Sequence, residues 1–126
     1  MSELQQQFGK QRVIFCHCDV TDYTQFEEAF QVTKDTFGKI DVLINNAEIQ
    51  NDKFWELEVI FSILKFKYKL ISFQVDVNLN GLIRGTLLAY QFMSKDKAKG
   101  GTIVNIGSSS SIKPFTSSPI YTATKH

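Results

Sequence analysis

Short apolar runs and longer amphipathic segments alternate along the chain. The apolar runs predict buried strands over 12–18, 40–44 and 102–106. Elsewhere, apolar residues recur every three or four positions, which predicts helices over 24–37 and 78–93. Because strands that alternate with helices pair in parallel, the pattern predicts an α/β fold with a parallel sheet.

The first predicted helix carries signals at both ends. Thr24 and Glu27 match a capping box at its start, and Gly38 is expected to end it. The apolar stripes are Phe26, Phe30, Thr33 and Phe37 in this helix, and Leu79, Leu82, Thr86, Ala89 and Met93 in the second. Each helix therefore has one side suited to burial.

Candidate ligand contacts follow the ends of the three predicted strands. They are Asp19 after the first, 45–47 after the second and Ser108 after the third. Ligands of parallel α/β sheets bind outside the carboxyl ends of the strands. Ser108 shares its loop with 109–111, which are interpreted as a polar connection. The sequence thus predicts a ligand site at this edge of the sheet.

Tyr121 and Lys125 stand four residues apart, which places them on one face of a helix. A phenol ionises near pH 10, so it acts as a base at neutral pH only when something such as a nearby ammonium stabilises its anion. Ser108 adds a hydroxyl that can hold a substrate oxygen. The Tyr-x-x-x-Lys spacing alone is common on solvated helices, but with Ser108, Asp19 and Asn45 it points to hydride transfer at a nicotinamide.

The order of these motifs from Asp19 to Lys125 resembles that of the short-chain dehydrogenases and reductases. Within that family the chain is most similar to the NAD-dependent 15-hydroxyprostaglandin dehydrogenases and related short-chain alcohol dehydrogenases. The segments that carry this similarity are 85–88, 99–105 and 121–126. The resemblance implies a partial Rossmann-type doubly wound parallel sheet, with residues 1–126 as the central part of one NAD(P)-binding domain.

The resemblance also implies a catalytic set of four residues. These are Asn78, Ser108, Tyr121 and Lys125. In this interpretation Asn78 holds a water in a proton relay to Lys125, and Ser108 holds the substrate oxygen.

Cofactor contacts are implied at six positions. These are Asp19, Val20, Asn45, Ala47, Tyr121 and Lys125. Asp19 and Val20 would border the adenine, and Asn45 and Ala47 would pass under the cofactor. NAD follows from the resemblance within the family, while NADP stays open because the strand that selects between them is absent from this chain. A small alcohol or ketone substrate and a homodimer of the full-length protein are implied as partners.

Compared with the family, the chain lacks the opening strand and the Gly-x-x-x-Gly-x-Gly turn, and it stops one residue after Lys125. We expect it to be truncated at both ends. The family strand order 3-2-1-4-5-6-7 makes 12–18 the third strand and 40–44 the fourth. Two absent strands would lie between them, a gap of roughly 14 Å. We therefore expect these residues alone not to form the native sheet of the family.

Residues 59–74 are surplus to the family spacing, which is met if Glu58 is joined directly to Val75. One hypothesis is a translated short intron, since Val59 and Gln74 can supply its GT and AG ends. The alternative is a real inserted loop or strand, because apolar residues alternate with lysines over 64–70. Such an insert would add an apolar segment close to the substrate side.

Glu48 follows Asn-Asn-Ala at a position where the family normally has glycine. A glutamate adds a Cβ, bulk and a charge where the backbone would approach the cofactor closely. We expect Glu48→Gly to improve cofactor binding in a completed chain.

Composition agrees with this interpretation. The chain has 126 residues, 43% of them hydrophobic, and a formal net charge of +1, which is typical of one soluble globular domain and gives no reason to invoke nucleic acid. Residues 1–8 are polar where a secretory signal would be apolar. A cytoplasmic protein without a membrane span is expected.

Cys16 and Cys18 lie two apart in the first predicted strand, on one face, where they are poorly placed to pair. Buried free thiols are expected. His17 would point to the opposite face and no second ligand cluster accompanies it, so no metal site is expected.

Two functions follow. The first is NAD-dependent oxidation of a secondary alcohol, hydroxyprostaglandin-like or another small or lipid alcohol. The alternative is a non-catalytic truncated paralogue or fragment, favoured by the absent Gly-rich turn and by Glu48.

Overall fold

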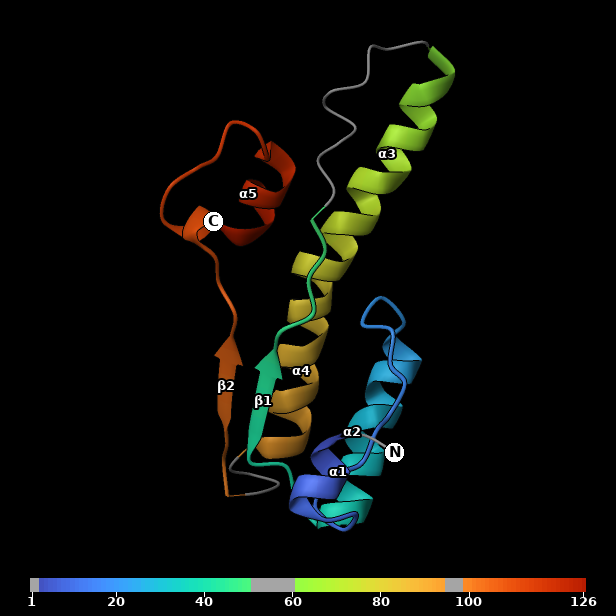
Figure 1. Ribbon diagram of the computed structural model, residues 1–126, viewed down its shortest axis with the longest axis vertical. Helices are drawn as coiled ribbons and strands as arrows, with labels where there is room; N and C mark the ends of the chain where they lie inside the picture. The colour runs from blue at the N-terminus through green and yellow to red at the C-terminus, as the bar shows by residue number, and fades with distance from the viewer. Residues whose placement is uncertain (1–2, 51–60, 95–98) are drawn as a thin grey trace.

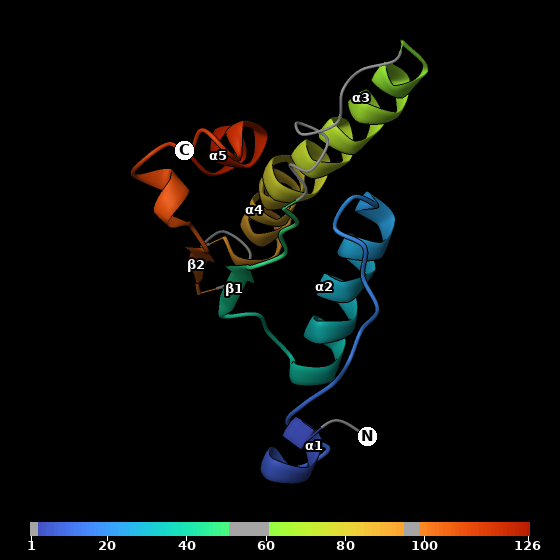
Figure 2. The same ribbon diagram turned by 45° about the horizontal axis from the view of Figure 1, so that its top comes forward.

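The computed structural model describes residues 3–50, 61–94 and 99–126, and Figure 1 shows their arrangement. The elements in chain order are α1 (Glu3–Phe8), α2 (Tyr23–Phe37), β1 (Val42–Asn45), α3 (Phe61–Val75), a π-helical turn (Asp76–Asn80), α4 (Gly81–Met93), β2 (Thr102–Asn105), a 3₁₀ turn (Ser109–Ser111) and α5 (Pro119–Lys125). Two views place α4 centrally, with α2 on one side and α5 on the other (Figures 1 and 2).

The sheet of the described residues has two parallel strands. Val42 of β1 stands opposite Thr102 of β2, and Asn45 opposite Asn105. The second and third predicted strands are thus confirmed within two residues at each end. The parallel pairing also confirms the predicted α/β fold.

The prediction of a strand over 12–18 is wrong. This segment forms no strand in the structure. An extended segment becomes a strand only when a neighbour supplies its ladder of hydrogen bonds. In the part of the chain that the structure describes, no strand lies beside it to do so.

Helix α2 has a cap at each end. The side chain of Asp22 accepts hydrogen bonds from the backbone N–H groups of Thr24 (2.9 Å) and Gln25 (3.2 Å). The predicted capping box at Thr24 is therefore wrong, because Asp22 caps the helix instead. Gly38 ends the helix as predicted, with φ of 81° in the left-handed region.

The core lies where α2 and α4 pack on β1. Phe30 of α2 and Leu88, Ala89 and Met93 of α4 are buried together, with Leu43 of β1 partly buried against them. The apolar stripe of the second predicted helix therefore contributes Ala89 and Met93 to the core. Phe37 and Leu79, which belong to the predicted stripes, are exposed instead.

Residues 61–75 form helix α3, so the predicted β-segment over 64–70 is wrong. The helix continues through the π-helical turn into α4, and the joined helices make a long rod whose α3 end extends beyond the sheet (Figure 1). The helix predicted to begin at Asn78 thus begins at Phe61. Residues 59 and 60, the first two of the suspected insert, lie outside the described residues. No helix of the described residues is long and apolar enough to cross a membrane.

Candidate active site

Helix α5 brings Tyr121 and Lys125 together. Pro119 stands in its first turn, and the spacing of four residues places both side chains on one face. Tyr121 is buried, and the side chain of Lys125 is 7% exposed. The Lys125 Nζ lies 6.0 Å from the centroid of the Tyr121 ring. The predicted proximity of phenol and ammonium is present in the structure.

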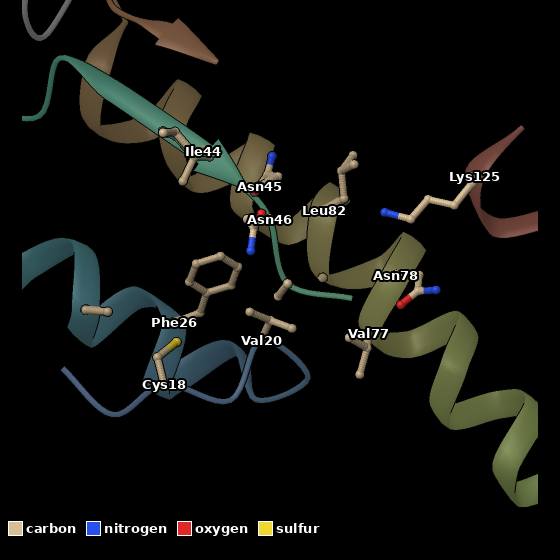
Figure 3. A pocket seen from close by; sticks show the side chains of 14 residues that line it. Cys18, Val20, Phe26, Ile44, Asn45, Asn46, Val77, Asn78, Leu82 and Lys125 are labelled. Carbon is tan, nitrogen blue, oxygen red and sulfur yellow. The ribbon is translucent and has the colours of Figure 1, made fainter. Parts of the chain in front are cut away.

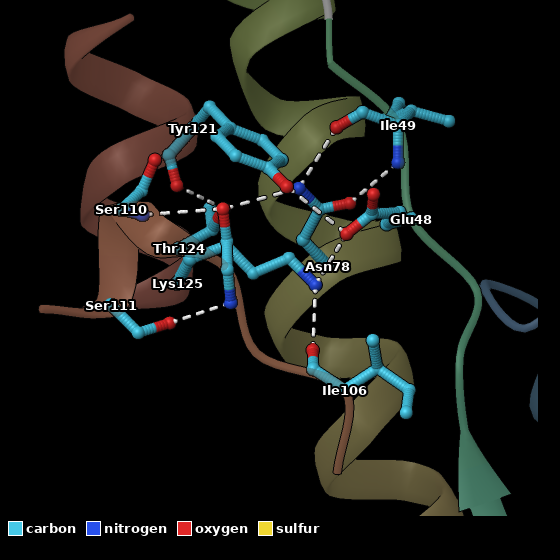
Figure 4. A network of polar contacts seen from close by, with 10 residues as sticks. Glu48, Ile49, Asn78, Ile106, Ser110, Ser111, Tyr121, Thr124 and Lys125 are labelled. Carbon is cyan, nitrogen blue, oxygen red and sulfur yellow. Dashed lines mark hydrogen bonds and ion pairs between the residues drawn. The ribbon is translucent and has the colours of Figure 1, made fainter. Parts of the chain in front are cut away.

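A carboxylate joins this pair. Glu48, in the segment after β1, accepts a hydrogen bond from Tyr121 Oη through its Oε2 atom at 3.1 Å, and the same oxygen lies 2.7 Å from Lys125 Nζ (Figure 4). Lys125 Nζ also donates to the carbonyl of Ile106 at 3.0 Å. The hydrogen bond from Lys125 holds the pKa of Glu48 below its ordinary value, with a further contribution from Tyr121, while partial burial acts in the opposite direction.

Asn78 lies in the π-helical turn and is almost fully buried. Its Nδ2 donates to the Ile49 carbonyl (2.9 Å) and to Thr124 Oγ1 (3.1 Å), and its Oδ1 accepts from the Ile49 N–H (2.8 Å). The amide thus fastens the segment after β1 to α5. Among the described residues, no direct hydrogen bond joins Asn78 to Lys125.

Ser108 caps the 3₁₀ turn that precedes α5. Its Oγ accepts from the Ser110 N–H at 3.2 Å, and its own N–H donates to Ser111 Oγ at 3.0 Å. The hydroxyl keeps its donor hydrogen for another partner. Within the described ranges, no hydrogen bond connects Ser108 to Tyr121 or Lys125.

A pocket of about 210 Å³ opens at the carboxyl end of β1 (Figure 3). Five of the predicted site residues line it: Val20, Asn45, Ala47, Asn78 and Lys125. The structure therefore brings the two predicted cofactor segments and the end of α5 to one cavity. Three predicted residues, Asp19, Ser108 and Tyr121, are not part of its lining.

Asp19 is exposed beside the pocket and binds its own turn. Its Oδ1 accepts from the Thr21 backbone N–H (2.9 Å) and from Thr21 Oγ1 (2.8 Å), and these bonds lower the pKa of Asp19. Asn45, by contrast, links the two strand ends through its Nδ2, which donates to Asn105 Oδ1 at 2.9 Å.

Two residues of this region were missed as contacts in the sequence. Arg84 of α4 reaches the Val20 carbonyl (3.3 Å) and pairs with Asp76 (2.8 Å), so it ties the turn after 12–18 to the helical rod. In the sequence Glu48 stands out only as a substitute for glycine, and nothing there predicts its pairing with Lys125. Both contacts join residues far apart in sequence, and no local pattern signals them.

The two cysteines are free, as expected, but they are half-buried rather than buried. Burial raises the pKa of the Cys18 thiol, and the neighbouring Asp19 adds to the effect. No group of three His, Cys, Asp or Glu residues that could hold a metal gathers among the residues described.

Known dehydrogenases are similar to this chain over nearly its whole length. The family model for short chain dehydrogenases matches residues 1–126. The chain is 36% identical over 124 residues to 15-hydroxyprostaglandin dehydrogenase [NAD(+)] of Rattus norvegicus, covering 98% of this chain and 41% of the relative. It is 30% identical over 118 residues to (+)-borneol dehydrogenase 2 of Salvia officinalis, covering 94% of this chain and 39% of that protein.

Solved structures are similar as well. The structure of ElxO with NADP bound is 28% identical, with a TM-score of 0.75 over 98% of this chain and 47% of that one. A structure of ElxO with NADPH bound gives a TM-score of 0.76 at 27% identity, over the same shares of the two chains. The chain spans about two fifths of the length of the curated 15-hydroxyprostaglandin dehydrogenase that it matches, at 41%. The α/β fold of the described residues is part of a doubly wound parallel sheet like that of these structures. The chain belongs to the short chain dehydrogenase family.

Proposed function

We propose that this protein is a nicotinamide-dependent oxidoreductase that interconverts a secondary alcohol and its ketone. A hydroxyprostaglandin-like or another small or lipid alcohol is the substrate class, by similarity to 15-hydroxyprostaglandin dehydrogenase. The observation that carries the proposal is the buried pairing of Tyr121 with Lys125, whose side chain lines the pocket at the end of β1.

The pocket fits one portion of a dinucleotide. Its volume of about 210 Å³ is below the roughly 300–1,000 Å³ of typical ligand sites, so it suits part of the cofactor. Val20 would border the adenine, Asn45 and Ala47 would lie beneath the cofactor, and Lys125 would donate to a ribose hydroxyl. The cofactor would supply the hydride acceptor of the oxidation.

NAD is the cofactor that we propose. The rat relative is named for NAD(+), whereas the two ElxO structures hold NADP or NADPH. The rat relative is the more similar in sequence, at 36% identity against 28% or less for ElxO, which favours NAD.

In the proposed reaction Tyr121 would take the hydroxyl proton of the alcohol. Lys125 would stabilise the phenolate by charge attraction. Ser108 retains a donor hydrogen that can bind the substrate oxygen. Asn78 would support the site by holding the segment that carries Glu48, because its amide is bonded to Ile49. The relay from Asn78 through a bound water to Lys125 stays a prediction from the family resemblance.

A matched pair of tyrosine variants tests the function. Tyr121→Phe removes the proposed base, whereas Tyr90→Phe removes a hydroxyl from an exposed residue of α4. With NAD⁺ and a panel of secondary alcohols, absorbance at the wavelength of NADH reports turnover. We expect Tyr121→Phe to lower kcat/KM by about 10²- to 10⁴-fold and Tyr90→Phe to leave it unchanged. Equal rates for the wild type and Tyr121→Phe would contradict the proposal.

A homodimer and a cytoplasmic location also belong to the proposal. An exposed apolar stripe runs from the π-helical turn into α4 and is formed by Leu79, Ile83, Leu87 and Tyr90. Burial of such a stripe against a second copy would remove apolar surface from water.

A non-catalytic member of the family is the second candidate. The observation that favours it is the carboxylate of Glu48, which occupies the polar groups of both Tyr121 and Lys125. Absence of NAD⁺ binding in both the wild type and Glu48→Gly would select this candidate.

A further inference from the structure

The position of Glu48 suggests a role beyond the proposed reaction. A single oxygen, Oε2, is shared between the Tyr121 hydroxyl at 3.1 Å and the Lys125 ammonium at 2.7 Å (Figure 4). Tyr121 and Lys125, both of α5, are the titratable groups that contact this carboxylate among the described residues. Asn78 lies close by but bonds the backbone of Ile49, next in the chain.

This contact restricts what Lys125 can do. An ammonium has three donor hydrogens, and Glu48 and the Ile106 carbonyl take two of them. The glutamate charge also offsets the lysine charge at the phenol. A phenolate formed on Tyr121 would face a carboxylate as well as an ammonium, so the stabilisation by Lys125 would be largely cancelled.

The carboxylate of Glu48 lies where it can move away from Lys125 into solvent. Its side chain is 42% exposed, against 7% for Lys125. It belongs to the segment after β1, which has no regular secondary structure up to residue 50. The carboxylate can therefore turn into solvent while the lysine stays beside the pocket.

We propose that Glu48 is a positioning residue that holds Tyr121 and Lys125 in a closed arrangement, and that its carboxylate competes with a cofactor ribose hydroxyl for the Lys125 ammonium. The inference rests on the proposed function. It makes NAD⁺ affinity depend on the charge of Glu48: neutralising the carboxylate frees Lys125 and strengthens binding.

The first test needs no cofactor. The ¹³C NMR signal of the Glu48 side-chain carboxyl, assigned by its loss in Glu48→Gln, is followed against pH in the wild type and in Lys125→Met. Because the ammonium favours the charged carboxylate, we expect Lys125→Met to raise the midpoint of this titration toward that of an unpaired glutamate. An unchanged midpoint would overturn the closed arrangement.

The second test measures NAD⁺ affinity by calorimetry near neutral pH. We expect Glu48→Gln and Glu48→Gly each to lower the Kd by about fivefold, the order of one partly exposed ion pair. The control is Glu28→Gln, which neutralises an exposed glutamate of α2 and should leave the Kd unchanged. Circular dichroism of each variant shows that the helices are retained.

The outcomes separate the inference from the proposed function. If the wild type, Glu48→Gln and Glu48→Gly all bind NAD⁺ with equal affinity, the role proposed for Glu48 is overturned and the proposed function stands. If the Kd falls as much in Glu28→Gln as in the Glu48 variants, the effect is one of general charge, and the role proposed for Glu48 is overturned. If neither the wild type nor any variant binds NAD⁺, the proposed function fails. The role proposed for Glu48 then fails with it, even if the NMR titration shows the ion pair.

Discussion

Two buried amide side chains, Gln74 and Asn78, stand four residues apart on the helical rod and differ completely in their partners. Asn78 makes three hydrogen bonds, to Ile49 and Thr124, and is 3% exposed. Gln74, at the end of α3, is 0% exposed, and among the described residues neither its Nε2 nor its Oε1 has a hydrogen-bond partner. Burying an amide without a partner costs about 1–3 kcal/mol.

The difference separates a buried amide whose polar groups are matched by the fold from one whose polar groups are not. Asn78 belongs to the motif that the family resemblance assigns to the site, and its partners come from the segment after β1 and from α5. Gln74 belongs to the suspected insert. The unsatisfied amide is what an added segment would produce, and it agrees with the hypothesis that 59–74 is surplus. Transcript reads that retain this segment throughout would contradict the intron form of that hypothesis.

The largest expected contrast concerns packing in the two regions. Leu88 of α4 is fully buried in the core, whereas Tyr68 of α3 is 73% exposed. Leu88→Ala should lower the free energy of unfolding by about 2–5 kcal/mol, because it removes core contacts and leaves a cavity. Tyr68→Ala should change it by about 0.5 kcal/mol or less. Urea unfolding followed by circular dichroism measures both changes, and similar losses for the two variants would contradict the difference in packing.

Removing the satisfied amide should have the next largest effect. Asn78→Ala leaves the N–H and carbonyl of Ile49 without their side-chain partner. We expect a loss of about 1–3 kcal/mol in the free energy of unfolding. Faster amide hydrogen exchange at Ile49 would locate the loss, whereas unchanged exchange there would contradict the assigned contact.

The unsatisfied amide predicts a change of opposite sign. Gln74→Leu replaces a buried polar group without partners by an apolar one of similar size, so it should stabilise the protein by about 1 kcal/mol. The matched control is Gln91→Leu, at an exposed position of α4, which should be near neutral. A destabilising Gln74→Leu would mean that the amide has a partner in solution.

The smallest contrast is the pH dependence of the Glu48 contact. The pKa of Glu48 is lowered in the folded protein, so its contribution to stability is complete above the ordinary value of about 4.3 and is lost as pH falls through the lowered pKa. Because the side chain is 42% exposed, the effect should be only a few tenths of a kcal/mol. It is measured as the difference in unfolding free energy between the wild type and Glu48→Gln at about pH 6 and about pH 3.5. A difference that does not shrink at the lower pH would contradict the ion pair.

Much of the fold could be predicted from local pattern. The two paired strands, helix α2 with its glycine end, and the burial of Phe30, Ala89 and Met93 follow from periodicity and from the conformational freedom of Gly38. The proximity of Tyr121 and Lys125 follows from helix spacing alone.

The failures have physical reasons. Segment 12–18 has the composition of a strand but no strand beside it among the described residues. Over 64–70, alternating lysines suggested a strand, yet no glycine or proline stands between Gly38 and Gly81 to stop a helix that runs into α4. The contact between Glu48 and α5 joins residues 73 positions apart, and only the folded chain brings them together.

Lys125 stands at the proposed nicotinamide site, so its replacement should weaken nucleotide binding. The most direct measurement is an NADH titration of the wild type and Lys125→Met, followed by the fluorescence of the bound nucleotide. We expect saturable binding to the wild type and a Kd about tenfold higher for Lys125→Met, since a charged donor to the ribose is lost. Binding of equal strength in both proteins, or no binding in either, would contradict it.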